Sequence, residues 1–177
     1  MKPVNVNPLY DLIRSAKAQT TRQGLIGQRD DARETEAPDE SCRRYVLRTF
    51  DFHLGGKGQT SFIFNLDDQI SCVIWKGEFG GDLDGEGAFY DLSDLIQKGF
   101  KRTYNERAFS PRDGMGELRW RTFKLAKYER LTITTRQRKI RFPNRTLEVS
   151  RSFLQPQASF LPKVAELTTR PLDDLFC

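Results

Sequence analysis

Apolar and polar positions alternate along several stretches of the chain, a pattern typical of strands that bury one face. Phe62, Phe64 and Leu66 share one parity, whereas residues 70–75 are apolar at almost every position and indicate a central strand. Short turns link the first three predicted strands into an antiparallel meander. Strands are expected at residues 44–54, around 62–66, and at 70–75, 117–126, 129–136 and 146–154.

Helical spacing of apolar residues is clearest over residues 91–104, where Leu92, Leu95, Ile96 and Phe100 share one face. The preceding residues 77–87 read as a glycine-rich acidic loop, and residues 105–116 as another loop. The predicted fold class is therefore α+β. It has a mainly antiparallel sheet of about six strands packed with one principal amphipathic helix.

The N-terminal 41 residues are predicted to form a flexible arm. Pro8 suits the first turn of a short amphipathic helix over residues 8–18, and residues 20–40 are polar enough for a mobile linker. A globular α+β domain over 42–155 and a tail over 156–177, with room for a short helix, complete the expected organisation. The apolar residues expected to serve assembly are Leu9, Leu12, Ile13, Leu175 and Phe176.

Composition limits the class of protein. The chain has 177 residues, enough for one core, and its mean hydropathy is −0.62. No apolar run approaches the ~20 residues that a membrane helix needs, and the first residues do not match a secretory signal. The cysteines number three and are widely spaced, which favours a reducing compartment. We therefore expect an intracellular protein, either cytoplasmic or nuclear.

Charge is unevenly distributed along the chain. Residues 101–177 contain 17 Lys/Arg against 8 Asp/Glu, whereas residues 1–100 contain 12 against 16. Many of these basic residues alternate along predicted strands, so they could line a solvent-facing sheet surface that binds phosphates. The alternative is a solvated surface with local glutamate partners. The candidate anion-binding residues are Arg119, Arg121, Lys124, Arg136, Arg138, Lys139, Arg141 and Arg145.

Motifs of catalysis are absent from the sequence, and no cofactor is predicted. Asp82, Asp84 and Glu86 match only the first half of a calcium loop, because Ser93 occupies the position of its bidentate glutamate. His53 is the single histidine, and a chemical role for it or for Cys72 stays open.

The sequence favours a non-enzymatic structural, assembly or accessory protein that binds RNA or an anionic membrane surface through its basic C-terminal half. Self-association through the N-terminal arm and a protein contact through the C-terminal tail are expected. A basic β-rich domain with such an arm is similar in outline to the matrix proteins of negative-strand RNA viruses. A protein-binding effector or host-defence inhibitor is the alternative, and a small enzyme that uses His53 is a third reading.

Overall fold

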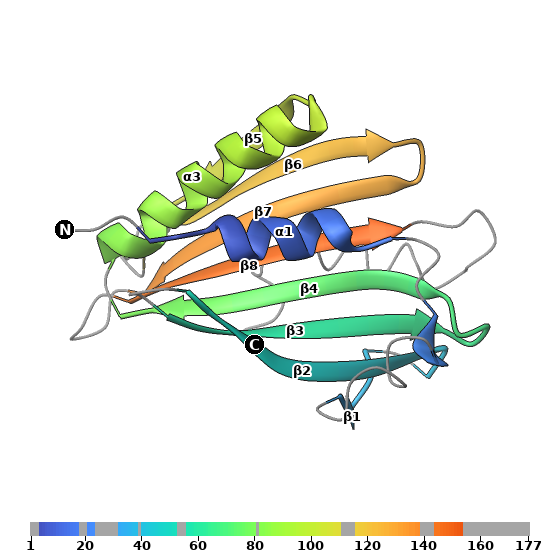
Figure 1. Ribbon diagram of the computed structural model, residues 1–177. Coiled ribbons are helices and arrows are strands. Elements are labelled where there is room, and N and C mark those ends of the chain that lie inside the picture. The colour runs from blue at the N-terminus through green and yellow to red at the C-terminus, as the bar shows by residue number, and fades with distance from the viewer. Residues whose placement is uncertain are drawn as a thin grey trace.

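One antiparallel sheet dominates the computed structural model of the chain, with helices on one of its faces (Figure 1). The structure describes residues 4–17, 21–23, 32–38, 40–52, 56–80, 82–110, 116–138 and 144–153. In that part of the chain the sheet has eight strands rather than about six, and the α+β class is confirmed. In chain order the elements are α1 (Asn7–Ser15), β1 (Arg33–Thr35), β2 (Cys42–Phe52), β3 (Gly56–Asn65), β4 (Ile70–Phe79), α3 (Asp82–Phe100), β5 (Tyr104–Phe109), β6 (Leu118–Ala126), β7 (Glu129–Arg138) and β8 (Asn144–Phe153).

The sheet consists of two four-stranded meanders that meet at their last strands. Its order is β1-β2-β3-β4-β8-β7-β6-β5, and a helix precedes each meander. Trp75 of β4 pairs with Val149 of β8, and these two residues hold equivalent places in the two meanders. Counted from them along each strand, Val73 of β4 is equivalent to Leu147 of β8, and Phe79 is equivalent to Phe153; all four are buried apolar residues. The two halves are therefore related by an approximate twofold arrangement that the sequence alone did not reveal.

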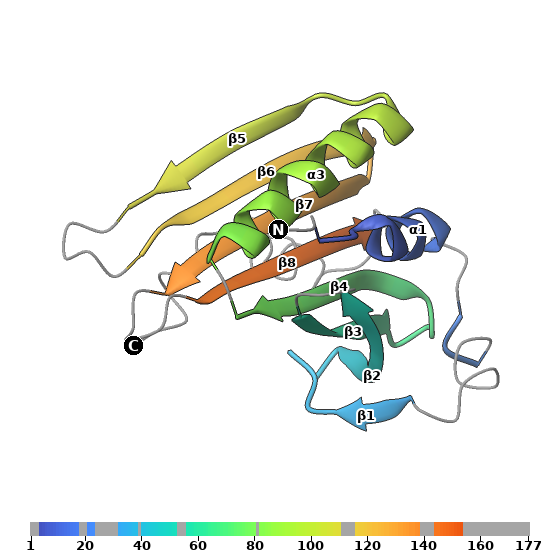
Figure 2. The same ribbon diagram turned by 60° about the vertical axis from the view of Figure 1, so that its left-hand side comes forward.

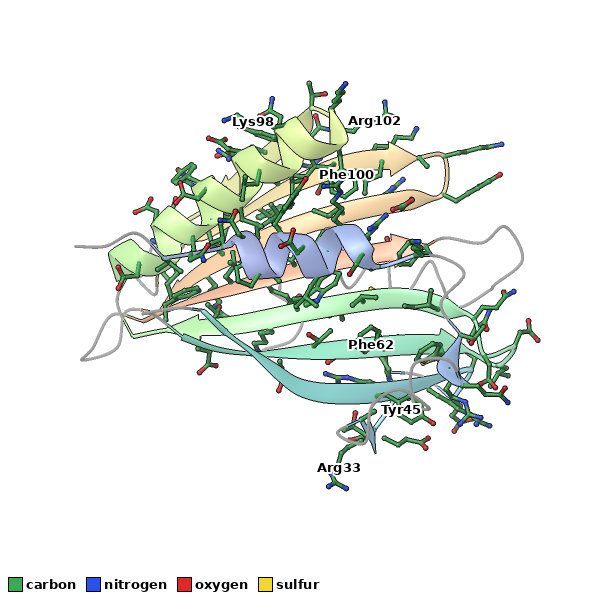
Figure 3. All side chains as sticks on the ribbon, viewed as in Figure 1. Arg33, Tyr45, Phe62, Lys98, Phe100 and Arg102 are labelled. Carbon is green, nitrogen blue, oxygen red and sulfur yellow. The ribbon has the colours of Figure 1, made fainter. Side chains whose placement is uncertain are left out.

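Both helices lie on the same face of the sheet, as the two ribbon views agree (Figures 1 and 2). The main core lies between them and the sheet, and its largest fully buried side chains include Phe64, Phe79, Phe89 and Phe123. Phe62 and Phe100 are partly buried at the margin of this core (Figure 3). Burial of this apolar surface is the main driving force for the fold.

The N-terminal helix is part of the core rather than the tip of a flexible arm. Leu9 and Ile13 are buried in the main cluster, and Leu12 packs against it. Arg151 of β8 donates a hydrogen bond from Nη1 to the carbonyl oxygen of Ile13 at 2.5 Å, which ties α1 to the sheet. Within this chain, the apolar residues expected to serve assembly through α1 instead contact the protein's own interior.

Part of the expected linker is also held against the sheet. Thr21 forms an isolated bridge with Gln69, and Arg22 pairs through Nε with Asp68 at 2.8 Å. The Tyr45 hydroxyl accepts a hydrogen bond from Arg22 Nη1 and donates one to the Glu34 carboxylate, each at 3.1 Å. Tyr45 therefore links β2 to β1 and to residue 22, and it is labelled near Arg33 in Figure 3.

The principal helix begins at Asp82, well before the expected start at residue 91. Its first turns contain Gly85 and Gly87, which made this segment read as a loop. A Cβ atom at Gly85 would lie 2.7 Å from the Cβ atom of Arg145 on β8, so only glycine allows α3 to approach the sheet this closely. Gly99 is approached in the same way by the Tyr10 ring of α1.

Two strands of the sheet were not expected from the sequence. β1 and β5 are its edge strands, and every residue of both except Tyr104 is exposed. A strand without a buried side lacks the alternation by which strands are recognised. The segment around Glu106 therefore read as a loop, although it pairs with β6 along its whole length.

Candidate nucleic-acid interface

Cross-strand register divides the basic residues between the two faces of the sheet. Directly paired residues in an antiparallel sheet share a face, and neighbours along a strand alternate. Val73, Trp75 and Val149 mark the face under the helices. We name the opposite side the helix-free face, because neither α1 nor α3 lies on it among the described residues (Figure 2).

Arg121 lies on the helix-covered face and is buried. Its Nε donates to Glu106 at 2.7 Å. Its guanidinium carbon lies 5.0, 4.8 and 4.3 Å from the ring centroids of Phe89, Tyr90 and Tyr104. An arginine enclosed by a carboxylate and three aromatic rings joins α3 to β5 and β6.

Arg119 and Arg145 lie on the same covered face. Arg119 donates through Nη2 to Glu117 at 2.5 Å, and its Nε lies 3.9 Å from Glu106. Arg145 is 3% exposed, with Nη1 within 3.4 Å of the Thr135 hydroxyl and Nη2 4.0 Å from Glu117. The expectation that Arg121 and Arg145 face solvent is therefore wrong, because strand parity directs them under α3.

Arg151 completes this buried group. Its Nε donates to Glu129 at 2.6 Å, and its guanidinium carbon lies 5.4 Å from the Phe100 ring and 5.1 Å from the Phe153 ring. Four arginines of β6 and β8 thus have glutamate partners from neighbouring segments. For these residues the structure matches the alternative of local glutamate partners.

The helix-free face has a different charge balance. Its acidic residues with described side chains are Glu78 and Glu148 only. Lys124 and Arg136 are the two anion-binding candidates from the sequence that lie here, and Arg136 is half-buried. The basic residues with described side chains on this face are Arg33, Arg44, Lys76, Arg107, Lys124, Arg130 and Arg136.

Most of these basic side chains lack a carboxylate partner. Lys76, Arg107, Lys124 and Arg130 are exposed, and no ion pair within 4.0 Å involves any of them among the described residues. Sequence reasoning missed three of these four. Their place on a common face depends on strand register and not on their spacing along the chain.

A row of uncharged, mostly small side chains crosses the centre of the helix-free face, perpendicular to the strands. Thr122 and Thr132 illustrate it, since they are directly paired and their hydroxyl oxygens lie 3.4 Å apart. From β2 to β5 this small-residue row consists of Val46, Ser61, Ile74, Ser150, Thr132, Thr122 and Asn105.

Rows with basic residues flank the small-residue row on both sides. We name them after Trp120 and Arg130. The Trp120 row runs through Gln59, Lys76, Glu148, Thr134, Trp120 and Arg107. The Arg130 row runs through Thr35, Arg44, Ile63, Cys72, Ser152, Arg130 and Lys124. The small-residue row thus has basic residues on both sides, although Ile63 and Cys72 in the middle of the Arg130 row are buried in a second apolar cluster with Cys42.

Aromatic side chains also lie on this face. Trp120 is half-buried, directly paired with Arg107 on one side and Thr134 on the other. Phe109, opposite Leu118 at the same edge of the sheet, is 44% exposed. Each offers part of an aromatic surface beside basic residues, an arrangement suited to stacking of bases.

Arg44 and Glu148, like Arg136, are partly buried on this face. Arg44 donates through Nη2 to the Ser61 hydroxyl at 3.2 Å, while its Nε is buried with no hydrogen-bond partner. Burial raises the pKa of the Glu148 carboxyl, and the positive charges of Lys76 and Arg44 oppose this shift. Glu148 accepts no hydrogen bond and forms no ion pair within the described chain.

The other candidate residues do not form a site among the described residues. Asp84 and Glu86 lie in the first turns of α3, as does the backbone of Asp82, and no cluster of three or more potential metal ligands occurs in the described ranges. Cys72 is a buried thiol whose pKa is raised by burial. The candidates His53, Lys139, Arg141, Leu175 and Phe176 lie outside the described residues, as does the Arg138 side chain.

Comparisons with known proteins give no match. A scan against protein-family models finds no matching family, and searches of curated proteins and of solved structures find no similar protein. Nothing in these comparisons points to an enzyme. The helices among the described residues are all too short or too polar to cross a membrane.

Proposed function

We propose that this chain is a non-enzymatic protein that binds a single strand of RNA across the helix-free face of its sheet. One observation carries the proposal. Arg119, Arg121, Arg145 and Arg151 on the covered face have carboxylate partners, whereas the exposed basic residues of the helix-free face have none among the described residues. Exposed basic residues gathered on one face of a sheet with few acidic neighbours are the electrostatic signature of a polyanion-binding surface.

The arrangement of side chains supports a single strand over a duplex or a bilayer. Together with Arg33, which pairs with Val46, the small-residue row crosses all eight strands, about 34 Å at ~4.8 Å per strand gap. Phosphates would contact the basic residues on both sides of the row while bases stack on Trp120 and Phe109, as in other single-strand binders. Thr122 and Asn105, the polar side chains of the row that are not buried, offer donors and acceptors for the ribose 2′-OH, which favours RNA over DNA.

A charge reversal on this face tests the proposal. Lys76, Arg107 and Arg130 replaced by glutamate should weaken binding of a fluorescein-labelled 12-nucleotide uridine RNA by at least about tenfold at moderate salt. The slope of log affinity against log salt should become shallower by about 2, because roughly 0.7 is lost with each phosphate contact. Fluorescence anisotropy at several salt concentrations measures both quantities.

The matched control reverses three exposed basic residues near the C-terminal end of α3, on the other side of the sheet. These are Lys98, Lys101 and Arg102, of which Figure 3 labels the first and last. The control carries the same change in net charge, so an equal loss of affinity would place binding elsewhere or make it nonspecific. Absence of RNA binding by the wild-type protein, with binding to phosphatidylserine-containing vesicles instead, would favour the membrane alternative.

A further inference from the structure

The Trp120 row contains a carboxylate in an unusual situation. Glu148 lies between Lys76 and Thr134, its direct cross-strand neighbours, and Trp120 pairs with Thr134 on the far side. Glu148 and Trp120 are thus two strands apart, about 9–10 Å. That separation allows the ring of a base stacked on Trp120 to extend over Thr134 with its edge toward Glu148.

The Glu148 carboxylate has unused hydrogen-bonding capacity. It is partly buried, and it accepts no hydrogen bond within the described residues. A carboxylate that no protein group satisfies is free to accept hydrogen bonds from a bound ligand. Since an ionised carboxylate is acceptor-only, the ligand groups that it binds are N–H or O–H donors.

We infer that Glu148 selects guanine in the RNA strand bound to the helix-free face, an inference that rests on the proposed function. The Watson–Crick edge of guanine presents two adjacent donors, N1–H and the N2 amino group, which match the two oxygens of one carboxylate. The neighbouring O6 atom is an acceptor, within the reach of the long cationic side chain of Lys76 next to Glu148.

The other bases match this pair of residues less well. Adenine and cytosine each place one amino donor beside a ring-nitrogen acceptor, so one carboxylate oxygen would face a lone pair. Uracil has a single N–H between two carbonyl oxygens, which would repel a carboxylate. Discrimination of this kind is strong where a polar group would otherwise be left unpaired.

The experiment compares 12-nucleotide uridine RNAs that carry one central guanosine, inosine or adenosine, or uridine alone. Fluorescence anisotropy should show the guanosine RNA bound at least about fivefold more tightly than the adenosine RNA. The inosine RNA should lose much of this advantage, because inosine differs from guanosine only in lacking the N2 amino group. This arm requires no change in the protein.

Two protein variants complete the test. Glu148→Gln should bring the guanosine and adenosine RNAs to within about twofold of each other while still binding all-uridine RNA, since an amide supplies only one acceptor. Glu78→Gln, on the same face in another row, should keep the preference. Equal wild-type affinity for all four RNAs, or an unchanged preference in Glu148→Gln, overturns the inference but not RNA binding. Failure of every RNA to bind overturns the proposed function itself.

Discussion

At the scale of single residues, Arg121 and Lys124 show how two basic side chains on one strand differ in role. Arg121 is enclosed by Glu106 and three aromatic rings, whereas Lys124 is exposed on the helix-free face. Both appear as members of one basic stretch in the sequence. Arg121 has the same strand parity as buried Phe123 and therefore lies on the covered face, whereas Lys124 has the opposite parity. This difference alone separates an arginine that stabilises the fold from a lysine that is a candidate for binding RNA.

Replacing these two residues by alanine should therefore give opposite outcomes. Arg121→Ala should lower the free energy of unfolding by about 3 kcal/mol, because it removes buried packing and leaves Glu106 without its closest partner. Lys124→Ala should change stability by less than about 0.5 kcal/mol but weaken RNA binding. Urea denaturation and anisotropy measure the two properties; equal stability of the two variants would contradict this assignment.

Glu148 gives a pH-dependent expectation. Its folded-state pKa is raised above the unfolded value by burial, so the ionised carboxyl opposes folding at neutral pH. The opposition is lost as pH falls through the folded pKa. Glu148→Gln should thus be more stable than wild type at pH 7, and the difference should shrink as pH is lowered. Urea denaturation of both proteins from pH 7.5 to mildly acidic pH checks this, and a constant difference would show that the pKa of Glu148 is not raised in the folded protein.

At the scale of elements, the strength of the sequence signal followed the degree of burial. The alternating patterns of β3 and β8, with Phe62, Phe64, Leu147 and Val149, predicted real strands. The edge strands β1 and β5 were missed because exposed strands have no apolar alternation. The start of α3 was missed because glycines that permit close helix–sheet approach also resemble loop residues.

Two glycines of α3 provide a matched pair. Gly87→Ala should stabilise the protein by about 0.5–1 kcal/mol, because no atom lies within 4 Å of the added methyl group and alanine favours the helix. Gly85→Ala should destabilise it, since the new Cβ would meet the buried Arg145 side chain at 2.7 Å. Thermal unfolding of both variants tests the packing of α3 on β8. Equal effects would show that α3 lies farther from the sheet.

The helix α1 makes a related point about the N-terminal segment. Ile13→Ala should cost about 2–5 kcal/mol because Ile13 is fully buried in the core, whereas exposed Arg14→Ala should have little effect. Urea denaturation measures both. Negligible loss in Ile13→Ala would restore the view of this segment as a dispensable arm, which its polar composition first suggested.

At the scale of the whole molecule, the two helices divide the sheet into faces with different tasks. Both pack on one face, where arginines are paired with glutamates and aromatic rings, and the other face retains exposed basic residues in rows around small side chains. The sequence predicted the excess of basic residues and, with Lys124 and Arg136, part of this surface. It could not predict that Lys76 and Arg44 contribute to this surface. The N-terminal half of the chain is acidic overall, and the pairing of β4 with β8 brings its basic residues next to the C-terminal half only in the folded sheet.

The two tryptophans of the chain permit the most direct test of this account. Trp120 lies on the helix-free face, whereas Trp75 is buried under the helices, so each indole N–H resonance reports on one face. During titration of the 15N-labelled protein with single-stranded RNA, followed by NMR, the Trp120 indole resonance should shift progressively while that of Trp75 stays nearly unchanged. Saturable RNA binding that leaves the Trp120 resonance in place, or that shifts Trp75 alone, would contradict the claim that RNA binds the helix-free face.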